Sequence, residues 1–222
     1  MTLHRERLSY NDRMQTPKPY DLIANQWHAN KRAHGYVQHV LSYVDRILED
    51  LPTGAKILDL GCGTGDPVAK YIIERGFTVT GIDESSEMLK FARQTVPEAE
   101  LIHADMVTVE LTDTFDAAVA WDSMFHVGRK HHAAIYRKLA NALRTGARLL
   151  LSVGGSAPAE DDSVEGFTSE MYDQTFYYSG FAPEVARKLI AASGFEIELW
   201  EVDDPTSRGH IAVIARKICR AS

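Results

Sequence analysis

Three glycines at alternate positions, directly after a short apolar segment at 57–60, constrain the fold more than any other feature of the chain. The apolar segment predicts a strand, and the residues after it predict a helix at 68–75, with Asp66 as its cap and Gly76 at its end. Glycine lets a ligand lie against the backbone where a Cβ would collide. The pattern therefore predicts a nucleotide-binding bend at the carboxyl end of a first strand, with a plain tight turn as the alternative.

The spacing of these glycines indicates the kind of nucleotide. The dinucleotide fingerprint G-x-G-x-x-G/A needs a small sixth residue, but this chain has Asp66 or Val68 there, depending on which glycine begins the run. The segment from Asp59 to Gly65 instead reads D-x-G-x-G-x-G, which resembles motif I of the class I S-adenosylmethionine-dependent methyltransferases. The resemblance implies S-adenosylmethionine as the cofactor, held in part by Asp59, Gly61, Cys62, Gly63 and Gly65.

Predicted strands and helices alternate along the chain. Strands are predicted at 57–60, 78–82, 101–103, 115–121 and 148–153, with helices at 68–75, 86–94 and 130–143 between them. Such alternation is typical of an α/β fold with a doubly wound parallel sheet. Two helices, at 20–32 and 36–51, come before it, and a helix at 183–192 and strands at 195–202 and 211–216 come after it. The resemblance implies a mostly parallel, seven-stranded sheet whose last strand is antiparallel.

The resemblance covers about residues 36–217, which we take as the methyltransferase domain. Residues 1–35 are predicted to form an N-terminal arm and a helix that closes over the cofactor. Within the domain, residues 155–180 are predicted to be irregular, acidic and aromatic, and to cover the active site. An ordinary solvated loop is the alternative for this insertion.

Composition excludes several classes of function. The chain has 222 residues and a formal net charge of −7, which argues against sequence-independent nucleic-acid binding. No apolar run approaches the ~18 residues of a membrane span, and the first residues lack a secretory apolar core. The two cysteines, Cys62 and Cys219, are not placed for a disulfide, so we expect a cytoplasmic protein. No spacing of residues predicts a metal site.

Acidic residues end the second and third predicted strands. Asp83 is placed to accept hydrogen bonds from a ribose diol, with a helix-capping acid as the alternative. Met88, in the next helix, is a candidate to pack on the purine or simply a core methionine. In the resembled family, the end of the third strand reads the adenine. The cofactor set predicted from these segments is Asp83, Glu84, Met88, Ala104, Asp105 and Met106.

The loop after the fourth strand lies where the sulfonium is expected. It reads W-D-S-M-F-H from Trp121 to His126 and lacks the [D/N/S]-P-P-[Y/F/W] tetrapeptide of nucleobase amino-methyltransferases. It is similar instead to the S-x-F-H loop of the small-molecule branch. Trp121 and Asp122 are therefore predicted to contact the cofactor, with a core aromatic role as the alternative for Trp121.

The segment that begins at Tyr20 resembles the Y-D-x-I-A-x-x-Y/W entry of small-molecule methyltransferases. In that family the aromatic residues close over the methionine end of the cofactor. The resemblance implies that Tyr20 and Trp27 do so here and that Arg32 reaches the cofactor carboxylate. The alternative is an aromatic contact that only attaches the segment to the body of the protein.

Methyl transfer from a sulfonium is an in-line displacement that needs alignment and exclusion of water, and needs a general base only for a protonated acceptor. His126 is the first candidate for that base because it follows the fourth strand and can titrate near neutrality. His28 and His210 are second candidates, His210 with an exposed position as its alternative. The predicted substrate-binding residues are His28, Tyr172, Tyr177 and Tyr178, and ordinary packing is the alternative for each.

The sequence therefore predicts a methyltransferase that uses S-adenosylmethionine and acts on nitrogen or oxygen of a small-molecule acceptor. Two other functions stay open. One is a non-catalytic adenosylmethionine-binding or regulatory domain, and the other is a nicotinamide-dependent oxidoreductase. No nucleic-acid or membrane partner is expected, and the oligomeric state does not follow from the sequence.

Overall fold

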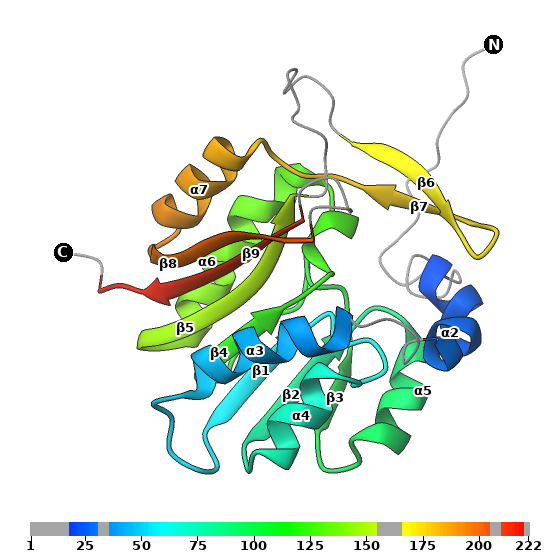
Figure 1. Ribbon diagram of the computed structural model, residues 1–222, viewed down its shortest axis with the longest axis horizontal. Helices are drawn as coiled ribbons and strands as arrows, with labels where there is room; N and C mark the ends of the chain where they lie inside the picture. The colour runs from blue at the N-terminus through cyan, green and yellow to red at the C-terminus, as the bar shows by residue number, and fades with distance from the viewer. Residues whose placement is uncertain (1–17, 31–35, 155–165, 205–209, 220–222) are drawn as a thin grey trace.

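The computed structural model describes residues 18–30, 36–154, 166–204 and 210–219. A twisted central sheet runs through the molecule, and helices cover both of its faces (Figure 1). The strands of this sheet are β1 Lys56–Leu60, β2 Thr78–Asp83, β3 Glu100–His103, β4 Phe115–Ala120, β5 Leu143–Gly154, β8 Phe195–Asp204 and β9 His210–Lys217. Their order across the sheet is β3-β2-β1-β4-β5-β9-β8.

The direction of the strands confirms the predicted fold class. Strands β1 to β5 pair with one another in parallel. Strand β9, the last in the chain, is antiparallel to both β5 and β8. The fold is therefore a doubly wound, mostly parallel seven-stranded sheet with an antiparallel last strand.

Two layers of helices bury the two faces of the sheet. The α-helices of the described residues are α2 Pro19–Asn30, α3 Tyr36–Leu48, α4 Val68–Glu74, α5 Ser86–Thr95, α6 His132–Ala142 and α7 Pro183–Ala192, and all but α2 belong to these layers. Successive strand residues point to opposite faces, so Ile57 packs with α3, α4 and α5, whereas Leu58 packs with α6 and α7. Burial on both faces explains why these strands read as continuous apolar runs.

Of the two predicted ends of α4, the one at Gly76 is confirmed and the one at Asp66 is wrong. Gly76 ends α4 with a φ of +86°, and Ser85 caps α5 because its Oγ accepts a hydrogen bond from Met88 N at 3.1 Å. The predicted capping role of Asp66 is wrong, since α4 begins at Val68 with no side-chain cap. The side chain of Asp66 belongs instead to the wall of the cavity described below.

The prediction that the segment 155–180 is irregular is wrong for its second half. Strands β6 Phe167–Met171 and β7 Gln174–Tyr178 form a separate antiparallel hairpin. Its turn residues, Tyr172 and Asp173, have φ values of 51° and 58°, as a two-residue hairpin turn requires. Because neither is glycine, the sequence gives no strong turn signal. Residues 155–165 of the insertion lie outside the described residues.

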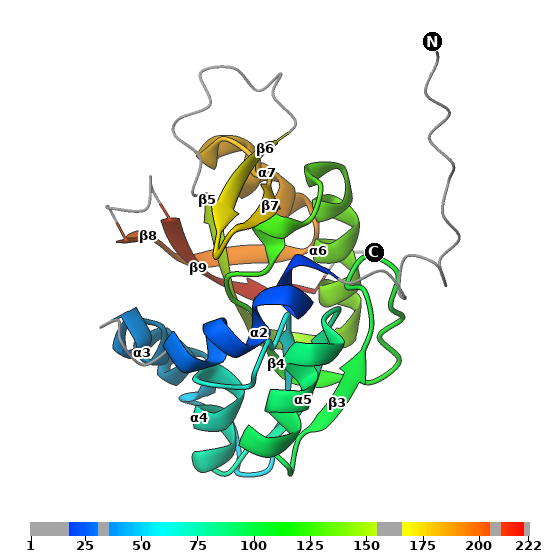
Figure 2. The ribbon, with the colours of Figure 1, turned by 90° about the vertical axis from the view of Figure 1, so that its right-hand side faces the viewer.

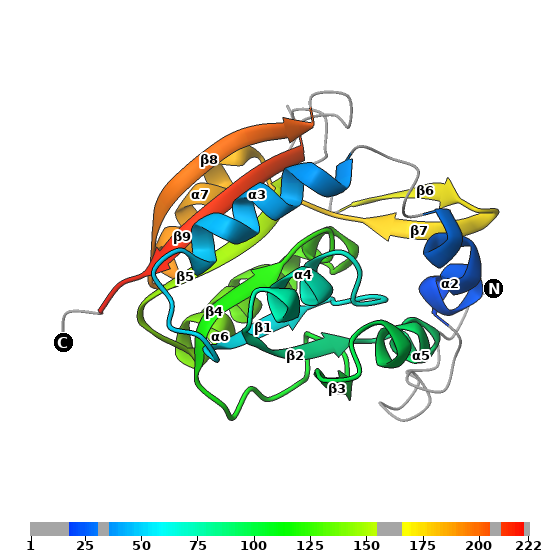
Figure 3. The same cartoon turned by 60° about the horizontal axis from the view of Figure 1, so that its bottom comes forward.

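Helix α2 and the β6–β7 hairpin lie side by side at one end of the molecule (Figures 2 and 3). The Tyr20 ring of α2 packs edge-on against Phe176 of β7, with ring centroids 4.9 Å apart. Asp21 joins α2 to the start of α5, because its Oδ1 accepts hydrogen bonds from Ser85 Oγ at 2.7 Å and Glu87 N at 3.2 Å. These contacts attach both elements to the segment that follows β2.

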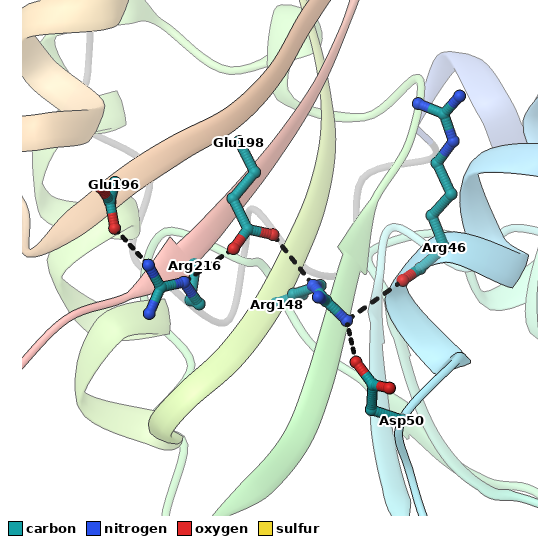
Figure 4. A network of polar contacts seen from close by, with 6 residues as sticks. All are labelled: Arg46, Asp50, Arg148, Glu196, Glu198 and Arg216. Atoms are coloured by element: carbon teal, nitrogen blue, oxygen red, sulfur yellow. Dashed lines mark hydrogen bonds and ion pairs between the residues drawn. The ribbon is translucent and has the colours of Figure 1, made fainter.

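A network of ion pairs joins the antiparallel strands and α3 (Figure 4). Arg148 of β5 and Arg216 of β9 are direct cross-strand neighbours, an arrangement that alone is repulsive. Glu198 of β8 accepts a hydrogen bond from each, at 2.9 and 2.7 Å, and so compensates the repulsion. Arg148 also pairs with Asp50, at 3.1 Å, just beyond α3. No helix in the described part of the chain has the length and the apolar run that crossing a bilayer requires.

Candidate functional site

A cavity of about 750 Å³ opens at the carboxyl ends of β1 to β4, beside α2 and the hairpin turn. This is the edge at which open α/β sheets bind their ligands. Its lining includes most of the residues predicted for the cofactor: Tyr20, Trp27, Asp59, Gly61, Cys62, Gly63, Asp83, Glu84, Met88, Ala104, Asp105, Met106, Trp121 and Asp122. His126 and Tyr172, predicted for catalysis and substrate binding, line the same cavity.

The glycine bend needs its glycines for different reasons. A Cβ on Gly61, whose φ is +87°, would collide with Ser123 of the loop after β4. A Cβ on Gly63 would meet no heavy atom within 4 Å, so the space beside this residue is open to a ligand. Gly65, predicted to bind cofactor, is outside the cavity lining, and its Cβ would lie 2.7 Å from Val96 Cγ2. Gly65 therefore permits close packing of the bend on α5.

Asp83 lies under the glycine bend at the end of β2. Its Oδ2 accepts a hydrogen bond from Gly63 N and its Oδ1 one from Ser85 N, both at 2.8 Å. Burial raises the pKa of Asp83 to about 6, although these two N–H groups act in the opposite direction. Asp83 thus carries a charged carboxylate at neutral pH that already has one contact to the bend.

The segment after β3 forms another part of the wall. Asp105 turns the chain there, because its Oδ1 accepts a hydrogen bond from Val107 N at 2.7 Å. Lys138 of α6 fixes the turn from behind by donating to Met106 O and Val107 O, both at 2.9 Å. Met88 lies in the same wall with 1% of its surface exposed.

The cover of the cavity comes from two distant segments. Tyr20, Trp27 and Asn30 contribute from α2, and Tyr172 contributes from the hairpin turn. Asn30 Nδ2 donates a hydrogen bond to Tyr172 Oη at 3.1 Å, which joins the two segments. Arg32, predicted to reach the cofactor carboxylate, lies outside the described residues.

Both ring nitrogens of His126 are engaged. Nδ1 lies 3.0 Å from Tyr177 O, a carbonyl that can only accept, so Nδ1 carries a proton. Burial lowers the pKa of His126, although the Tyr177 carbonyl and the charge of Asp122 oppose the shift. In the neutral ring Nε2 is therefore an acceptor, and it accepts a hydrogen bond from the Tyr20 hydroxyl at 2.8 Å. Burial also raises the pKa of Tyr20 well above its usual value.

Three residues predicted to bind substrate are not part of the described cavity lining. Tyr178 supports His126 from behind, with ring centroids 4.8 Å apart, and stacks on Phe125. Tyr177 contributes its carbonyl to His126 Nδ1. His28 stacks on Phe91 at 4.4 Å, away from the cavity. Sequence alone could not separate these supporting positions from lining ones.

The structure also places residues in the lining that the sequence analysis did not assign to the cofactor or substrate site. They are Asn30, Val40, Asp66, Pro67, Val68, Ile82, Val107, Ser123, Val127, Gly128 and His131. Ser123 lies in the loop after β4, and Asp66 directly follows the glycine bend, so their positions in the two motifs were an available signal. Val40 gave only the signal of a core residue on an amphipathic helix.

Acidic side chains dominate the charge of the cavity. The carboxylates in its lining are Asp59, Asp66, Asp83, Glu84, Asp105 and Asp122, and the described lining contains no Lys or Arg. Such a concentration of one sign favours a ligand that carries positive charge. Trp121 Nε1 is buried and has no hydrogen-bond partner among the described residues.

Comparison with known proteins identifies similar sequences. A family described as "Methyltransferase domain" matches residues 57–146. The putative methyltransferase YqeM of Bacillus subtilis is 34% identical over 169 residues, which cover 72% of this chain and 67% of that protein. The ubiquinone biosynthesis O-methyltransferase of Xanthomonas axonopodis is 31% identical over 62% of this chain and 59% of that protein. The match to methyltransferase GfsG of Streptomyces halstedii spans only 39% of that protein.

Solved structures share the fold at low sequence identity. A methyltransferase from Clostridium acetobutylicum described as S-adenosylmethionine-dependent superposes with a TM-score of 0.71, at 14% identity, over 91% of this chain and all of that one. The 1,6-didemethyltoxoflavin-N1-methyltransferase of Burkholderia thailandensis gives a TM-score of 0.66 at 19% identity, over 90% of this chain and 87% of that one. That structure contains 1,6-didemethyltoxoflavin and S-adenosylhomocysteine.

Proposed function

Because the chain belongs to the class I S-adenosylmethionine-dependent methyltransferases, with S-adenosylmethionine as cofactor, we propose that it methylates nitrogen or oxygen of a small-molecule acceptor. The observation that carries this proposal is the glycine bend above Asp83, in the wall of a cavity of about 750 Å³. The names of two similar proteins, a ubiquinone biosynthesis O-methyltransferase and a 1,6-didemethyltoxoflavin-N1-methyltransferase, support a small-molecule acceptor.

The residues of the cavity fit the cofactor. The open space beside Gly63 admits a ligand against the backbone, and Asp83 offers carboxylate oxygens to a ribose diol. In this proposal Met88, Ala104, Asp105 and Met106 surround the adenine. Glu84 lies beside Asp83, and Asp59, Gly61, Cys62 and Trp27 surround the aminoacyl part. The cofactor, when bound, supplies an activated methyl group.

The charge of the cavity supports a neutral or cationic acceptor over an anionic one. The described lining has six carboxylates and no Lys or Arg that would pair with an acidic acceptor. Tyr20, Tyr172 and Asn30 offer hydroxyl and amide groups that can orient such a molecule. Because α2 and the hairpin cover this end, they also exclude water from the transfer.

His126 is proposed as the general base for a protonated acceptor. Since its Nε2 accepts the Tyr20 hydroxyl, the proton of the acceptor would pass to Tyr20 Oη while the Tyr20 proton passes to His126 Nε2. The Tyr177 carbonyl then stabilises the resulting imidazolium at Nδ1. The lowered pKa of His126 keeps this base neutral and ready at physiological pH.

A cytoplasmic location and the lack of a nucleic-acid partner stay predictions. Their support is the net charge of −7 and the placement of the two cysteines.

Calorimetry with S-adenosylhomocysteine and with NAD, followed by methyl-release assays over a panel of amines, phenols and carboxylic acids, tests the proposal. We expect S-adenosylhomocysteine to bind, NAD not to bind, and at least one acceptor to give a methylated product. Gly61→Ala serves as the negative control for binding. Binding without product from any acceptor would favour the non-catalytic alternative, and NAD binding alone would favour the oxidoreductase.

A further inference from the structure

A buried histidine joins two carboxylates beside the cavity. His210, at the start of β9, places Nε2 2.7 Å from Asp122 Oδ1 and Nδ1 3.2 Å from Asp203 Oδ2. The side chains of His210 and Asp203 are 8% and 1% exposed, so the alternative of an exposed position for His210 is wrong. His39 of α3 reaches the other oxygen of Asp203 at 2.7 Å. This cluster connects β9, β8 and the loop after β4.

The geometry fixes the charge of His210. Both ring nitrogens face carboxylate oxygens, which only accept when ionised, so both nitrogens must carry protons. Burial alone would lower the pKa of His210, but its contacts with Asp122 and Asp203 outweigh burial and raise it. The imidazolium lies edge-on to Trp121, with ring centroids 5.2 Å apart, and so has little freedom to move.

Asp122 is held in an unusual backbone conformation. Its φ is 51°, a left-handed value that non-glycine residues adopt only when the surroundings support it. Two contacts provide that support: Asp122 N donates to Ser152 Oγ at 2.8 Å, and His210 binds the carboxylate. Asp122 lines the cavity, and the next residue, Ser123, touches the glycine bend at Gly61. The held carboxylate therefore lies beside the place proposed for the aminoacyl part of the cofactor.

We infer that His210 is a positioning residue that holds the Asp122 carboxylate to bind the aminoacyl ammonium of the cofactor. The inference rests on the proposed function. The cluster of Asp122, His210 and Asp203 carries a net negative charge, which suits a cationic amino group. A carboxylate fixed in advance loses less conformational freedom on binding than a mobile one. An amine on the acceptor shares this chemistry, so the test separates the two sources.

The test compares two ligands that differ only in the aminoacyl part. S-adenosylhomocysteine carries the ammonium, whereas 5′-methylthioadenosine lacks it. In His210→Asn the amide nitrogen can replace Nδ1 and reach Asp203, but nothing reaches Asp122. In His210→Gln the amide nitrogen can replace Nε2 and hold Asp122. The comparison of these two variants separates the contact to Asp122 from the contact to Asp203.

Calorimetry should rank the variants by their preference for S-adenosylhomocysteine over 5′-methylthioadenosine. We expect His210→Asn and Asp122→Asn to weaken S-adenosylhomocysteine by about ten- to hundredfold, as for loss of a charged hydrogen bond, and to leave 5′-methylthioadenosine unchanged. His210→Gln should retain most of the wild-type preference for S-adenosylhomocysteine. His39→Ala, which removes a contact to Asp203 at the surface, is the matched control and should leave the ratio of the two affinities unchanged.

Other outcomes overturn the inference. If His210→Asn weakens both ligands equally, His210 supports the shape of the cavity and not the ammonium. If the ratio of affinities stays at the wild-type value in both Asn variants, Asp122 does not bind the cofactor ammonium, and an amine acceptor becomes the ligand to test. Wild-type protein that binds neither nucleoside would overturn the proposed function and this inference with it.

Discussion

The Tyr20 hydroxyl donates a hydrogen bond to His126 Nε2 at 2.8 Å, and this bond joins α2 to the loop that follows β4. Phe176 of the hairpin packs on both rings, at 4.9 and 5.7 Å. The pair therefore joins the cover of the cavity, to which Tyr20 belongs, to the loop after β4, to which His126 belongs. Any acceptor that loses a proton to His126 must do so through Tyr20 or displace it.

His126→Asn should lower the rate of methyl transfer to a protonated acceptor by about a hundredfold. The Asn amide can still donate to Tyr177 O, so the variant removes the base and keeps the structural contact. Because the base must be neutral, wild-type activity should fall as pH drops through the lowered pKa of His126, below its usual 6.5. The pH–rate profile of the variant should lack this limb.

Tyr20→Phe is the companion variant, since it keeps the ring against Phe176 and removes only the hydroxyl. If the proton passes through Tyr20, this variant should lose activity to a similar extent. Turnover that is unchanged across pH in His126→Asn would remove the base from the mechanism.

Gly61→Ala should abolish binding of S-adenosylhomocysteine. The new Cβ collides with Ser123, and either the bend or the loop after β4 must move. Gly54→Ala is the matched control, because Gly54 has a similar φ of +81° but no heavy atom within 4 Å of the new Cβ. Both variants carry the same backbone strain, of about 1 kcal/mol. Equal binding by the two in calorimetry would contradict the role given to the bend.

Affinity for S-adenosylhomocysteine should depend on pH through Asp83. Its pKa of about 6 means that the carboxylate is charged at neutral pH and takes up a proton as pH falls below that value. A protonated carboxyl loses an acceptor for the ribose diol, so affinity should drop by up to about tenfold per pH unit below pH 6. In Asp83→Asn the affinity should be weaker at neutral pH and flat over this window. A flat wild-type profile would show that Asp83 does not contact the ligand.

Asp21→Ala should loosen α2 without unfolding the sheet. The Asp21 carboxylate accepts hydrogen bonds from Ser85 Oγ, Glu87 N and Lys18 N, and these outweigh burial and lower its pKa. Their loss should speed amide hydrogen exchange in α2 and the dissociation of S-adenosylhomocysteine several-fold. Asp45→Ala removes comparable bonds to Tyr71 and Arg75 elsewhere on the surface, and it should leave both rates unchanged.

The sheet and its helices could be predicted because their signals are local. Apolar runs gave the buried parallel strands, and Gly76 and Ser85 gave helix ends that depend only on neighbouring residues. The hairpin could not be predicted in this way, since the Tyr172–Asp173 turn lacks glycine and its strands are stabilised by packing on α2. Asp66 illustrates the same limit, because a residue suited to capping lines the cavity instead.

The candidate site likewise has a part that local sequence signals predict and a part that they do not. Asp59 and Asp83 lie in the last two residues of β1 and β2, and the glycines follow β1 directly, so strand prediction alone placed them at one edge of the sheet. The contact of His210 with Asp122 joins residues 88 positions apart, across strands whose order the sequence does not state. A lone histidine at the start of a strand gives no sign of such a partner, and only the three-dimensional structure reveals it.

The fit of Ser123 against Gly61 makes the bend and the loop after β4 a single rigid piece. Variation in that piece would disturb the nucleoside and the transferred group together, so neither loop is free to diverge alone. The Asn30–Tyr172 contact, in contrast, joins two peripheral segments by a surface bond. Replacement of the β6–β7 hairpin by that of a homologue should therefore alter the cover of the cavity while the bend and the loop after β4 stay intact.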